Sequence, residues 1–123
     1  MKDPSDYGFT QAVVVPSGNE LVYIAGQGGA DENGNYGDFS QQIERAFASL
    51  EKALTAVGAT SKDVVKITIL SVEHNEEKLN SISAKRRAFW GNHKPASTLI
   101  PVPRLASDGM LFEIDAIAVI SNS

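Results

Sequence analysis

Apolar residues recur at helical spacing in one long segment of the chain, which begins after Asp38. Counted from Ile43, apolar residues follow at offsets of 3, 4, 7, 10, 11 and 14 positions, the stripe that an amphipathic helix presents to a core. Asp38 is a residue type that caps the first turn of a helix, and Gly58 is a residue type that ends one. The pattern therefore predicts a helix between Asp38 and Gly58, with an apolar face formed by Ile43, Ala46, Phe47, Leu50, Ala53, Leu54 and Val57.

Segments rich in β-branched and aromatic residues predict five strands along the chain. They are Phe9–Val15, Leu21–Gln27, Val64–Val72, Ala96–Val102 and Met110–Ile120. Because the turn residues Pro16-Ser17-Gly18-Asn19 separate the first two strands, we expect these two strands to form a hairpin. A second helix is predicted to begin at Asn75 and to end near Gly91, with an apolar face formed by Leu79, Ile82, Phe89 and Trp90.

The predicted order of elements is β-β-α-β-α-β-β, which indicates an α+β fold with one mixed sheet and both helices on one face. The last strand is apolar on both of its faces, with Phe112, Ile114, Ala116 and Ala118 on one side and Leu111, Ile117 and Val119 on the other. Strands of this kind are usually covered on both faces. Since two helices cover only one face, we expect a second copy of the chain to cover the other, and we predict a homo-oligomer.

Composition narrows the class of protein. The chain has 123 residues, 42% of them hydrophobic and 21% charged, which predicts a single domain over residues 1–123. The absence of cysteine excludes disulfides, thiolate metal sites and cysteine nucleophiles. A net charge of −4 argues against nucleic acid as a partner. No apolar run is long enough to cross a membrane, and the first six residues lack the features of a signal peptide, so we expect a soluble cytoplasmic protein without a membrane partner.

Two carboxylates interrupt the apolar second face of the last predicted strand. Glu113 and Asp115 are two positions apart, so they point to the same face, about 7 Å from each other. A carboxylate on a largely apolar face suits a general acid or base. Alternatively, both lie on a solvated margin or form an ion pair with Lys66 or Arg104. The pair is the best catalytic candidate that the residue pattern offers.

The remaining polar residues offer less chemistry. The two histidines, His74 and His93, are nineteen residues apart and have no further ligand at metal spacing, so no metal site is expected. Lys85, Arg86 and Arg87 form the one basic run of the chain, inside the second predicted helix. Three consecutive positions fan around a helix, so we interpret this run as a solvent-exposed face and not as a nucleic-acid-binding stripe.

Three segments near the C-terminus resemble the signature of the RidA/YjgF family. They are Lys94-Pro95-Ala96-Ser97-Thr98, Val102-Pro103-Arg104-Leu105 and Phe112-Glu113-Ile114-Asp115-Ala116-Ile117-Ala118. Three upstream segments resemble the first two strands and the central strand of the family, namely Phe9-Thr10-Gln11-Ala12, Ile24-Ala25-Gly26-Gln27 and Asp63-Val64-Val65-Lys66-Ile67-Thr68. The resemblance implies a chorismate-mutase-like fold assembled as a homotrimeric barrel, with ligand clefts between subunits.

The resemblance also implies an activity. The best-known members hydrolyse reactive enamines and imines, made by pyridoxal-phosphate enzymes, to ketoacids and ammonia with no metal and no cofactor. Other relatives are described as endoribonucleases or translation inhibitors. By this resemblance, Glu113 falls on the glutamate thought to position the attacking water, and Gly26, beside Gln27, falls on a backbone position that lines the cleft.

Four further positions of the cleft that the resemblance implies depart from the family pattern. The arginine that clamps the substrate carboxylate is Ser97 here, the tyrosine near the N-terminus is Phe9, a serine or threonine is Ala25, and a cysteine is Leu99. Each departure removes a charge or a polar group, so we expect ordinary 2-imino acids to bind poorly and the substrate to be more apolar or to lack a free carboxylate. Arg104 is either a substitute clamp or the partner in a structural ion pair, and we favour the ion pair.

Two functions are consistent with the sequence. The first is a metal-free hydrolase or deaminase in which Glu113 orients water onto an enamine, an imine or a related reactive metabolite. The second is a homotrimer whose clefts bind a small-molecule metabolite without chemistry. Replacement of Glu113 separates the two, because only the enzyme depends on that carboxylate for turnover.

Overall fold

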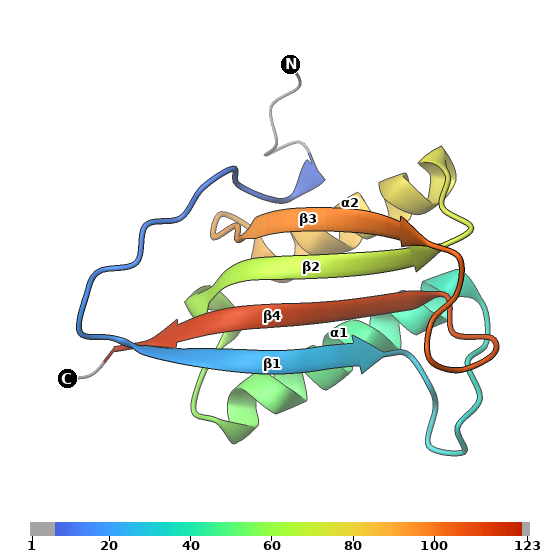
Figure 1. Ribbon diagram of the computed structural model, residues 1–123, viewed down its shortest axis with the longest axis horizontal. Coiled ribbons are helices and arrows are strands. Elements are labelled where there is room, and N and C mark those ends of the chain that lie inside the picture. The colour runs from blue at the N-terminus through green and yellow to red at the C-terminus, as the bar shows by residue number, and fades with distance from the viewer. Residues whose placement is uncertain (1–6, 122–123) are drawn as a thin grey trace.

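The computed structural model describes residues 7–121 as one four-stranded sheet with two long helices on one of its faces (Figure 1). Residues 1–6, in which no signal peptide was expected, and residues 122–123 lie outside the described part. The elements follow in the order β1 (Glu20–Gly28), α1 (Phe39–Ala56), the 3-10 turn η2 (Ser61–Asp63), β2 (Val64–Val72), α2 (Glu76–Trp90), β3 (Ala96–Val102) and β4 (Phe112–Ile120). Neither helix has the length and apolarity that a membrane-crossing segment within the described residues would need.

Both helices begin and end at the residues that the sequence indicates. The Asp38 carboxylate accepts from Gln41 N at 2.8 Å, and Gln41 Oε1 accepts from Asp38 N at 2.9 Å, which completes a capping box at the start of α1. Gly58, with φ of 80°, follows the end of this helix. In α2, the Asn75 side chain accepts from Lys78 N at 2.8 Å, and Gly91 is the C-cap. The apolar stripe of α1 provides most of the helical part of the core, with Ile43, Ala46, Phe47, Leu50 and Leu54 buried.

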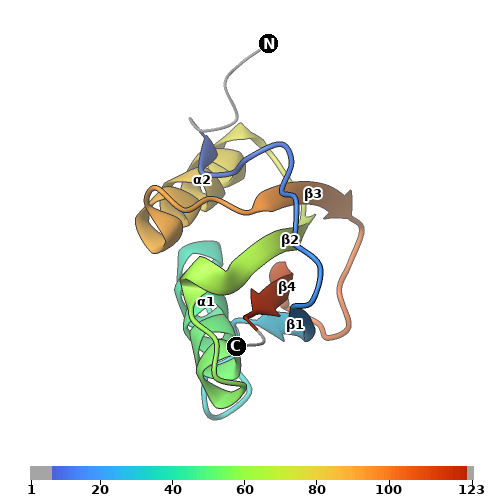
Figure 2. The same ribbon diagram turned by 90° about the vertical axis from the view of Figure 1, so that its left-hand side faces the viewer.

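The strands lie in the order β1-β4-β2-β3, with β2 and β3 parallel and the other two pairs antiparallel. Helix α2 connects the parallel pair, as parallel strands require a crossover, and both helices pack against the same face of the sheet (Figure 2). The predicted α+β class, with one mixed sheet and two helices on one face, is confirmed.

The prediction that Phe9–Val15 forms a hairpin with the following strand is wrong. Only Thr10 in this segment pairs with a strand residue, through an isolated parallel bridge to Ala96 in which Thr10 N donates to Pro95 O at 2.9 Å. Ala96 belongs to β3, and β3 and β1 are the opposite edges of the sheet. A segment that docks at the β3 edge therefore has no length left to pair with β1, and residues 11–18 run along one end of the sheet between the two edges (Figure 1). Tertiary docking overrides the local β-propensity here.

The second face of the sheet, away from both helices, carries exposed apolar side chains. Tyr23 and Leu21 of β1 are 72% and 51% exposed, and Ile100 of β3 is 44% exposed. In β4, the alternation is clean, because Phe112, Ile114, Ala116 and Ala118 face the core and are buried. The intervening residues Glu113, Asp115, Ile117 and Val119 keep some exposure on the second face. This face is where the sequence predicts a second copy of the chain.

Candidate functional site

Glu113 lies near the start of β4, in line with Gly28 of β1 and Leu70 of β2 on either side. The register between β1 and β4 shifts between Ile24 and Gln27, so Ala25 and Gly26 form a bulge in β1 opposite Asp115, two residues along β4 from Glu113. Bulges of this kind are frequent next to active sites because they redirect the backbone and the neighbouring side chains.

The carboxylate of Glu113 packs against the bare backbone of Gly26. A Cβ atom at position 26 would lie 2.5 Å from Glu113 Cδ and 2.8 Å from each carboxylate oxygen. A side chain at this position and the observed position of the carboxylate are therefore incompatible. The sequence-predicted residues Glu113, Ala25, Gly26 and Gln27 thus form one group, in which Gln27 Nε2 donates to Ala25 O at 2.9 Å.

The ion pairs considered for Glu113 and Asp115 are not formed. Lys66 Nζ instead donates to Thr98 Oγ1 at 2.6 Å, and Asp115 is exposed on the second face. Glu113 is half-buried, so it differs from Asp115 in having one side of its carboxylate covered by protein.

Arg104 lies in the connection between β3 and β4 and forms an ion pair with Asp108, with Nη2 and Oδ1 3.3 Å apart. Its side chain is 68% exposed, and its Nε donates to Leu105 O at 3.0 Å. Arg104 thus forms an ion pair at an exposed position, and its role as a substitute clamp stays a prediction.

Phe9, Ser97 and Leu99 line a second feature, a pocket of about 240 Å³ beneath α2 at the β3 edge. The other lining residues are Tyr7, Leu79 and Arg86. The walls are mainly aromatic and aliphatic, and the volume is below the range of about 300–1,000 Å³ that holds drug-sized ligands. The pocket therefore suits a small molecule with an apolar part.

Arg86 is a buried charged residue of this pocket that the sequence interpretation placed wrongly. We expected the basic run to be a solvated face, but Arg86 is 2% exposed. Its Nη1 donates to Ser97 Oγ at 2.9 Å, its Nη2 donates to Ser83 Oγ at 3.3 Å, and the centre of its guanidinium lies 5.2 Å from the centroid of the Phe9 ring. The sequence did carry a signal: Arg86 is four residues from both Ile82 and Trp90, which places it on the apolar face of α2.

Burial of this guanidinium weakens its hold on the proton. Desolvation is the main cause that lowers the pKa of Arg86 to about 10, and the neighbouring charge of Arg87 adds to the effect. No acidic side chain of the described residues forms an ion pair with Arg86. A positive charge is thus held inside the protein by two hydroxyl groups and an aromatic ring.

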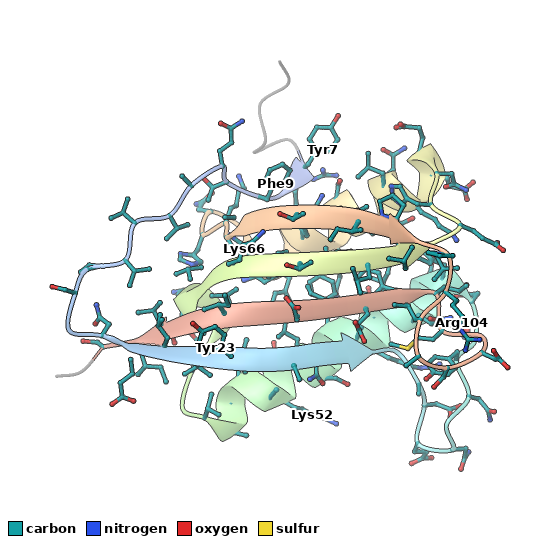
Figure 3. The ribbon with its side chains drawn as sticks, in the orientation of Figure 1. Tyr7, Phe9, Tyr23, Lys52, Lys66 and Arg104 are labelled. Carbon is teal, nitrogen blue, oxygen red and sulfur yellow. The ribbon has the colours of Figure 1, made fainter. Side chains whose placement is uncertain are left out.

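The two groups of candidate residues lie apart within one chain. Ser97 pairs with Ile67, which pairs with Ala116, so Glu113 is displaced from Ser97 by three residues along the strands and by two strand spacings, about 10 Å in each direction. Ser97 faces α2, whereas Glu113 faces the opposite side of the sheet. Figure 3 shows Tyr7 and Phe9 at the β3 edge, and Arg104 at the end of the sheet where β1 ends.

Comparisons of the sequence and of the structure with known proteins find relatives of one family. The sequence profile of the family described as Endoribonuclease L-PSP matches residues 3–120. A RutC family protein of Pyrococcus abyssi is 34% identical over 122 residues, which cover 95% of this chain and 91% of that protein. The human protein named 2-iminobutanoate/2-iminopropanoate deaminase is 28% identical over 122 residues, with 96% of this chain and 85% of that protein covered.

Solved structures agree with the sequence comparisons. A crystal structure of a Rid family protein from Yersinia pestis superposes with a TM-score of 0.89 at 34% sequence identity, covering 98% of this chain and 92% of that chain. RidA of an Antarctic Psychrobacter superposes with a TM-score of 0.74 at 28% identity, covering 91% of this chain and 88% of that chain.

Proposed function

Because this chain belongs to the RidA/YjgF family, whose profile carries the description Endoribonuclease L-PSP, we propose that it hydrolyses a reactive enamine or imine to a carbonyl compound and ammonia. The observation that carries the proposal is the position of the Glu113 carboxylate, half-buried and held against the Gly26 backbone beside a strand bulge. A carboxylate fixed on one side and open on the other is suited to hold one water molecule in a defined direction.

In the proposed reaction, Glu113 accepts a hydrogen bond from the water and removes its proton as the water oxygen attacks the imine carbon. That proton passes to the imine nitrogen to give a carbinolamine. The hydroxyl proton of the carbinolamine then moves to the same nitrogen as the carbon–nitrogen bond breaks, which leaves the carbonyl compound and releases ammonia. An enamine enters the same sequence after protonation at carbon gives the imine. The net change is addition of one water and loss of one ammonia, so the step requires no oxidant or reductant.

We further propose that the site is completed between subunits of a homotrimer. Within one chain, Glu113 and the pocket at Ser97 face opposite sides of the sheet, so a single small substrate cannot contact both. The exposed side chains of Leu21, Tyr23 and Ile100 support association through the second face. Light scattering coupled to size-exclusion chromatography tests this assembly, and a monomeric mass would contradict it.

The expectation that the substrate lacks a carboxylate depends on the loss of arginine at position 97. Two relatives are named for 2-imino acids, which carry a carboxylate beside the reactive carbon. The buried guanidinium of Arg86 lies against Ser97 Oγ at this position, so a cation is still present beside position 97.

The test of the proposed activity is an imine-hydrolysis screen in which amino-acid oxidases or amine oxidases generate the imine. Accelerated disappearance of at least one imine in the presence of the protein is expected, and Glu113→Ala and Glu113→Gln should each abolish the acceleration. Glu51→Gln is the matched control, because Glu51 is an exposed carboxylate on α1. A folded protein that accelerates no imine but retains an unaltered metabolite in native mass spectrometry would instead identify a non-catalytic binding module.

A further inference from the structure

We propose that Arg86 is the carboxylate-binding residue of this protein, supplying from helix α2 the guanidinium that is absent at position 97 of β3. The inference builds on the proposed function, since it names the substrate class of the same site: a small imino acid with an apolar side chain. It also replaces the expectation of a substrate that is more apolar or lacks a free carboxylate, which rested on the polar groups lost at positions 9, 25, 97 and 99.

The guanidinium of Arg86 has a buried hydrogen-bond donor without a partner among the described residues. A guanidinium carries five N–H groups and no acceptor. Ser97 Oγ accepts from Nη1 and Ser83 Oγ accepts from Nη2. Nε is a buried side-chain nitrogen of the described part that has no hydrogen-bond partner. Buried donors without partners are costly, so a ligand with two coplanar oxygens fits the charge and the geometry of this group.

The positive charge of Arg86 is buried without a neutralising ion pair among the described residues. Arg86 is 2% exposed, and none of the ion pairs formed by the described residues neutralises it. An unpaired buried cation is unfavourable, and a bound carboxylate would reverse that cost. The lowered pKa of Arg86 has the same origin, because desolvation is its main cause and a repulsive arginine is the other.

The pocket that Arg86 lines is otherwise uncharged. Arg86 is the one charged group among its six lining residues, and the side chains of Phe9, Leu79 and Leu99 provide apolar walls. Phe9 also stacks near the guanidinium, which holds the planar group in position. A single cation in an otherwise apolar pocket selects a molecule with one negative end and an apolar remainder.

The side chains at positions 86 and 97 are in direct contact. Ser97 Oγ accepts from Arg86 Nη1 at 2.9 Å, so the small side chain on β3 leaves room for the guanidinium that reaches it from α2. Ser97 therefore stands where the family pattern has an arginine, and its hydroxyl also orients Arg86.

The test measures binding without chemistry, so that its outcome is separate from that of the proposed hydrolysis. Isothermal titration or ligand-observed NMR compares 2-oxobutanoate with 2-oxobutanamide, which has a similar shape and no charge. Wild-type protein and Glu113→Ala should bind the carboxylate and not the amide. Arg86→Met should weaken carboxylate binding at least tenfold, whereas the matched control Arg87→Met, which removes the same charge from an exposed neighbour, should not.

A second variant keeps the proposal falsifiable if Arg86→Met destabilises the fold. The double variant Arg86→Met/Ser97→Arg moves the guanidinium back to β3 and should recover carboxylate binding, and Arg86→Lys should retain part of it. Equal binding of carboxylate and amide by the wild-type protein would overturn the proposal. Unchanged carboxylate affinity in folded Arg86→Met would also overturn it and leave Arg86 with a structural role. Loss of hydrolysis in Glu113→Ala with intact carboxylate binding would support both proposals independently.

Discussion

Gly26→Ala is the substitution that tests most directly whether the position of the Glu113 carboxylate matters. The added Cβ would lie 2.5 Å from Glu113 Cδ, whereas ordinary contacts begin near 3.4 Å, so the carboxylate has to retreat by about 0.9 Å. A displacement of about 1 Å at a reacting group can reduce the rate by about 100-fold. We therefore expect kcat for imine hydrolysis to fall by about two orders of magnitude.

The same substitution should hardly change the free energy of unfolding. Gly26 does not have a positive φ, so alanine is compatible with its backbone, and the unfolded chain loses about 0.4–1 kcal/mol of conformational entropy. The group that must move is the end of a flexible side chain, which limits the opposing strain. Urea unfolding followed by circular dichroism should place Gly26→Ala within about 1 kcal/mol of the wild-type protein.

Gly28→Ala is the matched control for this experiment. Its Cβ would lie 2.6 Å from Met110 Cε, so this second β1 variant displaces the end of a different side chain and leaves the Glu113 carboxylate in place. Turnover should therefore stay close to that of the wild-type protein. Wild-type turnover in Gly26→Ala, together with loss of turnover in Glu113→Ala, would refute the idea that contact with the Gly26 backbone positions the carboxylate.

Three further outcomes are expected. Tyr23→Lys places a charge on the exposed second face and should lower the oligomeric mass measured by light scattering, whereas Val57→Lys, at an exposed position after α1, should not. Carboxylate affinity should stay constant from pH 7 to 9 and fall as the pH rises through about 10, because Arg86 is charged below its pKa of about 10 and neutral above it. Carboxylate affinity measured at a series of pH values tests this expectation, and an affinity that does not fall above pH 10 would contradict it. Asp115→Asn should change turnover less than tenfold, since this exposed carboxylate lacks the backbone contact of Glu113, and a loss as large as that of Glu113→Ala would make the two carboxylates a functional pair.

Local patterns in the sequence predicted those features whose causes are local. The apolar stripe and the Asp38 cap define α1, because both depend on residues a few positions apart. The two-residue alternation placed Glu113 on the second face of β4 for the same reason. Residues 9–15 were misjudged because the docking of Thr10 onto β3 depends on residues more than eighty positions away.

Arg86 illustrates a different difficulty. Its spacing from Ile82 and Trp90 places it on the apolar face of α2, yet a charged residue type is normally assigned to solvent. Its burial becomes understandable only with Ser97, Ser83 and Phe9 around it, which come from the next strand, the same helix and the N-terminal segment. The composition of the pocket is therefore a property of the assembled fold, and neither residue pattern nor resemblance could reveal it.

The hydrogen bond between Arg86 and Ser97 also has an evolutionary consequence. A chain with arginine at both positions would place two like charges in contact, and a chain with arginine at neither would have a neutral pocket. Selection should therefore act on the two positions jointly, so that a guanidinium can move from strand to helix while the ligand chemistry persists. Subfamilies separated by the residue at position 97 alone would then group proteins that have relocated their cation with proteins that have lost it.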